Sequence, residues 1–317
     1  MSTAFRNFII TFALACALFA VVGYIVVNGV LDGLFNKGEG ASEDVTEYSY
    51  ENLESYYEGE YNASEEEIPS AEEFGESFVV FFEDHLNELC GAKYICINEE
   101  NGKMVFENIP LNSTIVVNGY SKTIKDAYKT NGVEFLVQKF KYVFGVEVSA
   151  YMVSNVKTLQ SFFSEGGLAK KLGIEMSCSL PYGIVDSSTV STENPDEITY
   201  VINPGDVVLT PKNAKYIFEY IPEDTYDSQS ASKMFAQIGE NVFKAVFSNN
   251  TMKDNSDYLK KFFTSCKQST FGSEKYGVLF GIYDGSYQVS GLSTLSSMAG
   301  KDLNWSTLPK SLESALK

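Results

Sequence analysis

The stretch SFVVFFEDHLNELCGAKYICINEENGKMVFEN, residues 77–108, is the clearest indication of the fold in this sequence. Its first six residues are an apolar run, which is typical of a strand buried on both faces. Two strand-like runs follow, KYICIN at 93–98 and KMVFEN at 103–108. They flank Glu99-Glu100-Asn101-Gly102, and an Asn-Gly pair is a strong signal for a hairpin turn. The stretch therefore predicts three neighbouring strands of one sheet.

Strand-like and helix-like patterns alternate after this stretch. Further strands are predicted at 114–117, 150–154, 200–202, 207–209 and 277–283. Helices are predicted at 132–144, 156–163, 211–220, 230–247, near 259–263 and at 292–299. The strongest is 230–247, where Ala231, Met234, Phe235 and Ile238 share one face. This interleaving predicts a single layered α/β/α domain with a central mixed sheet at 77–317.

An uncharged run, FIITFALACALFAVVGYIVV at residues 8–27, lies far upstream. At about 1.5 Å per residue it is long enough to cross a bilayer. A cleavable signal peptide is the alternative, although its apolar region is usually only about 7–15 residues. We expect a transmembrane helix at 8–30. Arg6 precedes it and acidic residues follow, so residues 1–7 should be a cytoplasmic tail and the rest extracytoplasmic. The expected location is the cell membrane, as a single-pass protein.

Residues 31–76 are expected to form an acidic stalk. Between residues 37 and 76 there are 14 acidic residues and one basic residue, Lys37. A segment that repels itself and lacks a sustained apolar period is typical of a disordered spacer. The whole chain has a formal net charge of −18, so most of its negative charge lies in this spacer. Nucleic acid is not expected as a partner, because binding it needs a basic surface.

The histidine and cysteine inventory limits the possible chemistry. His85 is the only histidine, which excludes multi-histidine metal sites and favours a structural role for this residue. Four cysteines follow the apolar run, and no Cys-x-x-Cys pair occurs among them: Cys90, Cys96, Cys178 and Cys266. Zinc is therefore not expected, whereas disulfides are permitted but cannot be assigned from spacing. Cys96 alternates within a predicted strand and should lie in the core.

Three segments together resemble the LytR-CpsA-Psr family. They are KYICINEENGKMVFENIPLNST at 93–114, IKDAYKTNGVEFLVQKF at 124–140 and VINPGDVVLTPKNAKYIFEYIPED at 201–224. The resemblance covers roughly residues 77–250 and is carried by the order and spacing of the segments. It implies an extracytoplasmic phosphotransferase. Family members move glycopolymers such as teichoic acid or capsule from a polyprenyl-pyrophosphate carrier to peptidoglycan, in Gram-positive envelopes among others.

The resemblance implies Mg²⁺ held by aspartates and arginines that grip the pyrophosphate, but this chain departs from that pattern. Where the family has Arg-Asp, it has Leu111-Asn112, and where an Arg-x-Arg pair should fall, it has Glu219 and Ile221. Arg6 is the only arginine in the chain. Asp84 matches one metal-binding aspartate, while the place of the second falls near Gly91-Ala92.

Lysines are left as candidates to bind a lipid phosphate. They are Lys122, Lys125 and Lys233, the last of which falls in the family's second arginine-bearing segment. Tyr128 matches a family tyrosine. Each has a simpler interpretation: Asp84 ends a strand, the lysines are solvated, Glu219 is a surface acid, and Tyr128 is a buried aromatic.

Three functions follow, in order of preference. The first is a non-catalytic envelope protein, a pseudoenzyme that binds a polyprenyl phosphate lipid, a cell-wall glycan or a protein partner and needs no cofactor. The second is an active glycopolymer–peptidoglycan phosphotransferase with Mg²⁺ on Asp84. The third is an unrelated anchored sensor or structural protein.

Overall fold

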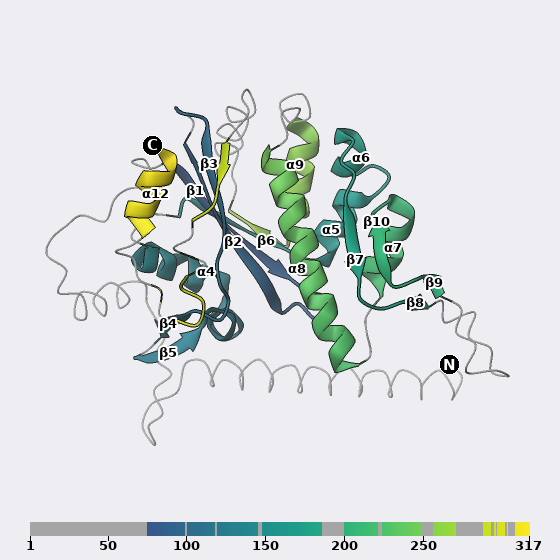
Figure 1. Ribbon diagram of the computed structural model, residues 1–317, viewed down its shortest axis with the longest axis horizontal. Coiled ribbons are helices and arrows are strands. Elements are labelled where there is room, and N and C mark those ends of the chain that lie inside the picture. The colour runs from purple at the N-terminus through teal and green to yellow at the C-terminus, as the bar shows by residue number, and fades with distance from the viewer. Residues whose placement is uncertain are drawn as a thin grey trace, which may run out of the picture. The chain divides into compact units, whose positions relative to one another are not determined.

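The computed structural model describes most of the predicted ectodomain (Figure 1). The described residues are 75–98, 100–117, 119–144, 148–185, 200–220, 224–248, 256–270, 288–292, 295, 297–301, 303 and 308–317. The predicted tail at 1–7, transmembrane helix at 8–30, stalk up to residue 74 and strand at 277–283 lie outside them. Within the described residues, no helix has the length and apolar character that a membrane span requires.

A six-stranded sheet forms the centre of the domain. Its strand order is β11-β6-β1-β2-β3-β12. In chain order these strands are β1 (Glu76–Glu83), β2 (Leu89–Asn98), β3 (Lys103–Asn108), β6 (Ala150–Ser154), β11 (Gln268–Ser269) and β12 (Gln288–Ser290). The first three are antiparallel neighbours, whereas β6 runs parallel to β1 and β12 parallel to β3. The predicted mixed sheet and the hairpin at the Asn-Gly turn are therefore confirmed.

Alternation along β1 builds two separate cores. Phe78, Val80 and Phe82 face one cluster of buried residues, whereas Val79 and Phe81 face the other. Successive side chains of a strand point to opposite faces, so one apolar run supplies both clusters. Figure 1 shows helices on each side of the sheet, which makes the domain an α/β/α sandwich as predicted.

The helix α8 (Thr225–Ser248) covers the first face, together with α5 (Val156–Phe163), α7 (Pro211–Glu219) and α9 (Ser256–Ser265). Its predicted apolar face is buried as expected. At Gly239 the helix approaches the sheet closely, since a Cβ there would lie 2.5 Å from Cδ1 of Phe82. Helix α7 begins at Pro211 behind a capping box formed by Thr210 and Asn213.

The other face is covered by α4 (Ile124–Phe144) and α12 (Leu308–Leu316). The prediction placed a helix only over 132–144, but α4 begins eight residues earlier. Gly132 explains the difference, because its backbone (φ 84°, ψ 178°) is not helical and divides α4 into two helical segments. A side chain strongly disfavours that conformation, so glycine permits the break.

Smaller elements complete the described residues. Three two-stranded sheets pair β4 (Thr114–Val117) with β5 (Tyr120–Thr123), β7 (Ser177–Leu180) with β10 (Gly205–Val208), and β8 (Ile184–Val185) with β9 (Tyr200–Ile202). Helix α6 (Leu168–Leu172) follows α5. The four described cysteines are free, and Cys96 lies in the core with no exposed surface. Burial raises the pKa of its thiol to about 11.

Candidate functional site

The carboxyl end of β1 places two acidic residues side by side. Glu83 ends the strand and Asp84 follows it, and each is 3% exposed. Because neighbouring side chains leave a strand in opposite directions, Glu83 faces α4 and Asp84 faces α8. The pairing with β2 shifts register between Phe82 and Glu83, so the strand is irregular at this point.

Asp84 closes the turn that joins β1 to β2. Its Oδ1 accepts hydrogen bonds from the backbone N–H groups of Leu86 and Glu88, at 2.8 and 3.0 Å. Its Oδ2 accepts one from the hydroxyl of Ser232 on α8. Both oxygens thus have partners within the protein, and the side chain fixes the turn and ties it to α8.

This arrangement leaves Asp84 little capacity to bind Mg²⁺. A carboxylate has about four lone-pair positions, and that of Asp84 already accepts three protein donors, the N–H groups of Leu86 and Glu88 and the hydroxyl of Ser232. The place of the family's second aspartate holds Gly91, which packs against Phe82 and Ala236. Across the ranges that the structure describes, no three His, Cys, Asp or Glu residues group as metal ligands would.

His85 lies in the same turn. Its Nε2 is 3.4 Å from Oγ of Ser228, and its ring centroid is 5.7 Å from that of Phe235. Its Nδ1 is buried with no hydrogen-bond partner among the described residues. These contacts attach the turn to the first part of α8, which is a structural role.

The predicted phosphate-binding lysines lie on three different elements: Lys122 on β5, Lys125 on α4 and Lys233 on α8. Lys125 forms an ion pair with Glu88 at 3.4 Å, and Lys129 forms a second with the same carboxylate at 3.1 Å. The Nζ of Lys122 donates to Oγ1 of Thr130 at 3.4 Å. Lys233 is exposed on α8 and Glu219 is exposed at the end of α7. Hydrogen bonds from Lys129 and then Lys125 hold the pKa of the Glu88 carboxyl below its usual value.

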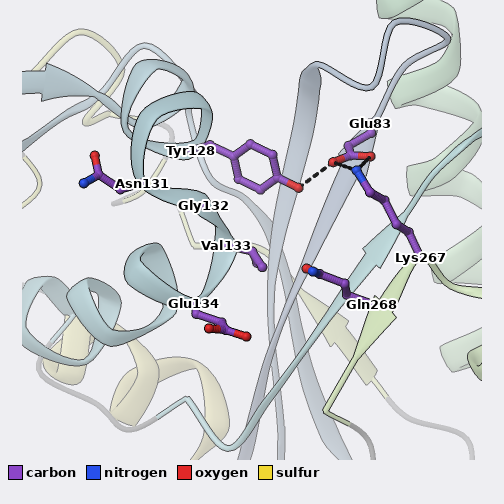
Figure 2. Close-up of a pocket in the computed structure, with 8 residues that line it drawn as sticks. All are labelled: Glu83, Tyr128, Asn131, Gly132, Val133, Glu134, Lys267 and Gln268. Atoms are coloured by element: carbon purple, nitrogen blue, oxygen red, sulfur yellow. Dashed lines mark hydrogen bonds and ion pairs between the residues drawn. The ribbon is translucent and has the colours of Figure 1, made fainter. Parts of the chain in front are cut away.

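A cleft of about 330 Å³ opens on the other side of the strand end (Figure 2). It is lined by Glu83, Tyr128, Asn131, Gly132, Val133, Glu134, Lys267 and Gln268. Of the sequence candidates only Tyr128 is among them; Asp84, Glu219 and the three lysines are not.

An ion pair between the buried Glu83 and the partly exposed Lys267 forms one wall of the cleft. The Nζ of Lys267 donates to both carboxylate oxygens of Glu83, at 2.8 and 2.7 Å. The hydroxyl of Tyr128 donates to Oε1 of the same carboxylate at 2.8 Å, and both contacts are drawn in Figure 2. Burial, and then the bond to Glu83, raise the pKa of the Tyr128 hydroxyl far above its usual value, so it is a donor at neutral pH.

Three elements bring this wall together. Lys267 immediately precedes β11, and its backbone N–H donates to the carbonyl of Val153 on β6 at 2.9 Å. In β11 itself, Gln268 pairs with Val153. Tyr128 is held against β1 by its ring, whose centroid is 5.6 Å from that of Phe81. The lysine therefore reaches β1 from the sheet's edge and the tyrosine from α4.

The opposite wall is the start of the second helical segment of α4. The break at Gly132 turns Val133 into the cleft and leaves Glu134 exposed beside it. The hydroxyl of Tyr151 lies 3.4 Å from Oε1 of Glu134, a long hydrogen bond. Burial and then Glu134 raise the pKa of this tyrosine.

Sequence reasoning missed Glu83, Lys267 and Gln268. Glu83 was hidden by its neighbour Asp84, which carried the family match. Lys267 and Gln268 follow a short helix with no motif around them. A local signal did exist for the other wall, because a glycine after Lys129-Thr130-Asn131 marks a break in a helical pattern.

Comparisons with known proteins were made for sequence and for structure. No protein-family model and no curated protein sequence matches the chain. Solved structures do match. A structure of TagT bound to LI-WTA is 12% identical, with 89% of this chain and 98% of that chain covered and a TM-score of 0.46. Bacillus subtilis TagV is 11% identical over 75% and 98% of the chains, with a TM-score of 0.45.

A putative transcription regulator from Eubacterium siraeum is 13% identical over 82% of this chain and 98% of that chain, with a TM-score of 0.44. TagT and TagV are members of the LytR-CpsA-Psr family, the family that the sequence resembles.

Proposed function

We propose that this chain is a non-catalytic cell-envelope protein, anchored by residues 8–30, whose LytR-CpsA-Psr-like domain binds a wall glycan and transfers nothing. The observation that carries this proposal is the use of Asp84. Its carboxylate, the best match to a metal ligand of the family, accepts two backbone N–H groups and the hydroxyl of Ser232.

The cationic side chains support the same conclusion. Arginine grips a pyrophosphate with a planar fork, whereas lysine offers a single charged point. Beyond Arg6 the chain has only lysines, and the ammonium groups of Lys125, Lys129 and Lys267 pair with Glu88 or Glu83. If each lost charged hydrogen bond costs roughly 1.5–3 kcal/mol, losing several forks removes most of the affinity for a diphosphate.

The cleft favours a glycan over the other partner classes. Seven of its eight lining residues offer a polar side chain or a backbone bend, and only Val133 is apolar. A prenyl chain needs an extended apolar groove, which this lining does not supply. A sugar needs a small number of convergent donors and acceptors, and those are present.

The test is a transfer assay with the purified full-length chain. We supply Mg²⁺, a polyprenyl-pyrophosphate-linked glycan and peptidoglycan, and measure the release of polyprenyl phosphate and the glycan bound to the wall. No turnover is expected, while an arginine-bearing relative run in parallel should be active. Turnover comparable to that of the relative would overturn the proposal and establish an active phosphotransferase.

Binding is measured separately. Native mass spectrometry of the detergent-extracted protein shows whether a polyprenyl phosphate copurifies, and sedimentation with isolated walls shows whether the chain binds glycan. We expect wall binding without a copurifying lipid. A stoichiometric polyprenyl phosphate, or no retention on walls, would contradict the proposed glycan-binding role.

A further inference from the structure

We infer that the cleft between α4 and β11 binds the protonated amine of a small sugar, and that Glu134 is the residue that recognises it. The inference deepens the proposed function and rests on it for the class of partner, a glycan. It narrows that glycan to one with free amino groups.

The charges around the cleft disfavour an anion. Of the described residues that line it, three are charged: Glu83, Glu134 and Lys267. Their sum is a formal charge of −1. The single cation is also largely committed, because two of the three N–H donors of the Lys267 ammonium point at the oxygens of Glu83. A phosphate or carboxylate group would meet one remaining donor and an uncompensated negative charge.

The two carboxylates are not equivalent. Glu83 is buried, and three hydrogen bonds from Lys267 and Tyr128 occupy its oxygens. Glu134 is exposed and, among the described residues, accepts only the long bond from the Tyr151 hydroxyl. Glu134 is therefore the carboxylate that can accept the N–H donors of a ligand.

A neutral acceptor lines the same cleft. Figure 2 shows the amide end of Gln268 directed toward Val133, the residue that precedes Glu134. An ammonium group placed between Gln268 and Glu134 could donate to the carboxylate and to the amide oxygen. The remaining N–H of Lys267 and the amide nitrogen of Gln268 are left to bind hydroxyl oxygens.

The size of the cleft fits a single sugar unit. A volume of about 330 Å³ lies at the lower end of the range for small-molecule sites, roughly 300–1,000 Å³. Residues of α4 form one side of the cleft and the Glu83–Lys267 pair forms the other. Hydrogen bonds within the protein hold Glu83 in place, so this side needs no ligand to form. The cleft is thus suited to one ring with an amino substituent.

A matched pair of sugars separates charge from shape. Glucosamine and N-acetylglucosamine share a ring but differ in whether the nitrogen is protonated, and binding of each to the full-length chain is measured by calorimetry in mildly acidic, low-salt buffer. We expect glucosamine to bind at least about threefold more tightly, a preference that high salt removes because a partly exposed ion pair is screened.

The variant Glu134→Gln keeps the size of the side chain and removes its charge. It should abolish the preference for glucosamine, whereas the control Glu165→Gln, at an exposed carboxylate paired with Lys170, should retain it. Equal affinities for the two sugars, no binding of either, competition by inorganic phosphate, or a preference that survives Glu134→Gln would each overturn the inference. None of these results changes the transfer assay, so the two proposals fail separately.

Discussion

Glu83 and Asp84 are consecutive, equally buried and both acidic, yet the protein uses them differently. Asp84 faces α8, and its carboxylate accepts hydrogen bonds from nearby neutral groups, the N–H groups of its own turn and the hydroxyl of Ser232. Glu83 faces α4 and is neutralised by a residue far along the chain, Lys267. The first carboxylate fixes a loop, and the second forms the wall of a cleft.

The difference shows how one strand end can use two neighbouring carboxylates in different ways. The Asp84 carboxylate is stabilised by backbone N–H donors and has no cation bonded to it. The Glu83 carboxylate has no such backbone donors and is paired with the ammonium group of Lys267. The two side chains point to opposite faces of the sheet because successive residues of a strand alternate in direction. Substitutions at Lys267 and Asp84 test whether the two carboxylates are as different as this comparison states, and a substitution at Lys129 tests the exposed carboxylate of Glu88 near them.

The largest effect is expected from Lys267→Met. The substitution leaves the Glu83 carboxylate buried with only the Tyr128 hydroxyl as a described side-chain partner. Removing one partner of a fully buried pair costs about 3–5 kcal/mol, and the lysine side chain is 40% exposed, so we expect a loss of about 2–4 kcal/mol in the free energy of unfolding. Urea titration measures it.

The control is Lys170→Met, which breaks an exposed pair with Glu165 and should cost less than about 1 kcal/mol. Equal effects of the two substitutions would show that the Glu83–Lys267 pair is no more than a surface contact.

Asp84→Ala comes next, with an expected loss of about 1–3 kcal/mol because it leaves turn N–H groups without an acceptor. Asp84→Asn should recover most of that loss, since an amide oxygen can still accept from Leu86 and Glu88. A metal ligand would behave differently. We therefore also expect the melting temperature of the unsubstituted chain to be unaffected by Mg²⁺, and a rise on adding Mg²⁺ that Asp84→Asn abolishes would refute the structural role.

The smallest effect concerns Glu88, the exposed carboxylate at the same strand end. Lys129 and Lys125 lower its pKa, so its contribution to stability is present above the unfolded-state pKa and is lost as the pH falls through the lower, folded-state pKa. At 38% exposure this contribution is a few tenths of a kcal/mol at most. In Lys129→Ala the pKa of Glu88, followed by NMR, should rise, and no change would show that the pair does not form in solution.

Local patterns predicted the centre of the fold. Three local patterns were enough to predict their elements: the apolar run at 77–82, the Asn-Gly turn and the apolar face of α8. In each of them the residues that determine the structure lie close together in the sequence. The first half of α4 was missed because Asn131 and Gly132 look like a helix start. Strands β11 and β12 are two and three residues long and have no period to detect.

The candidate site was predictable only in part. Asp84 and Tyr128 were found because they occupy family positions, but the metal role of Asp84 was carried over from arginine- and aspartate-bearing relatives. The Glu83–Lys267 pair had no sequence signal, because long-range pairing depends on which edge of the sheet β11 joins. Tertiary packing therefore determines that Asp84 has a partner within its own turn, whereas the partner of Glu83 is the distant Lys267.

The contact between Lys267 and Glu83 spans 184 positions of the chain. Closing so long a loop is slow compared with forming the β1–β2 hairpin, and its entropy must be lost before the ion pair compensates. A chain that emerges from its N-terminus first can pair β1 with β2 and β6, and β2 with β3, while Lys267, β11 and β12 are still to come. The cleft is therefore a late product of folding, and in a chain truncated before residue 267 the Glu83 carboxylate would have no cation beside it and only the Tyr128 hydroxyl as a described side-chain partner.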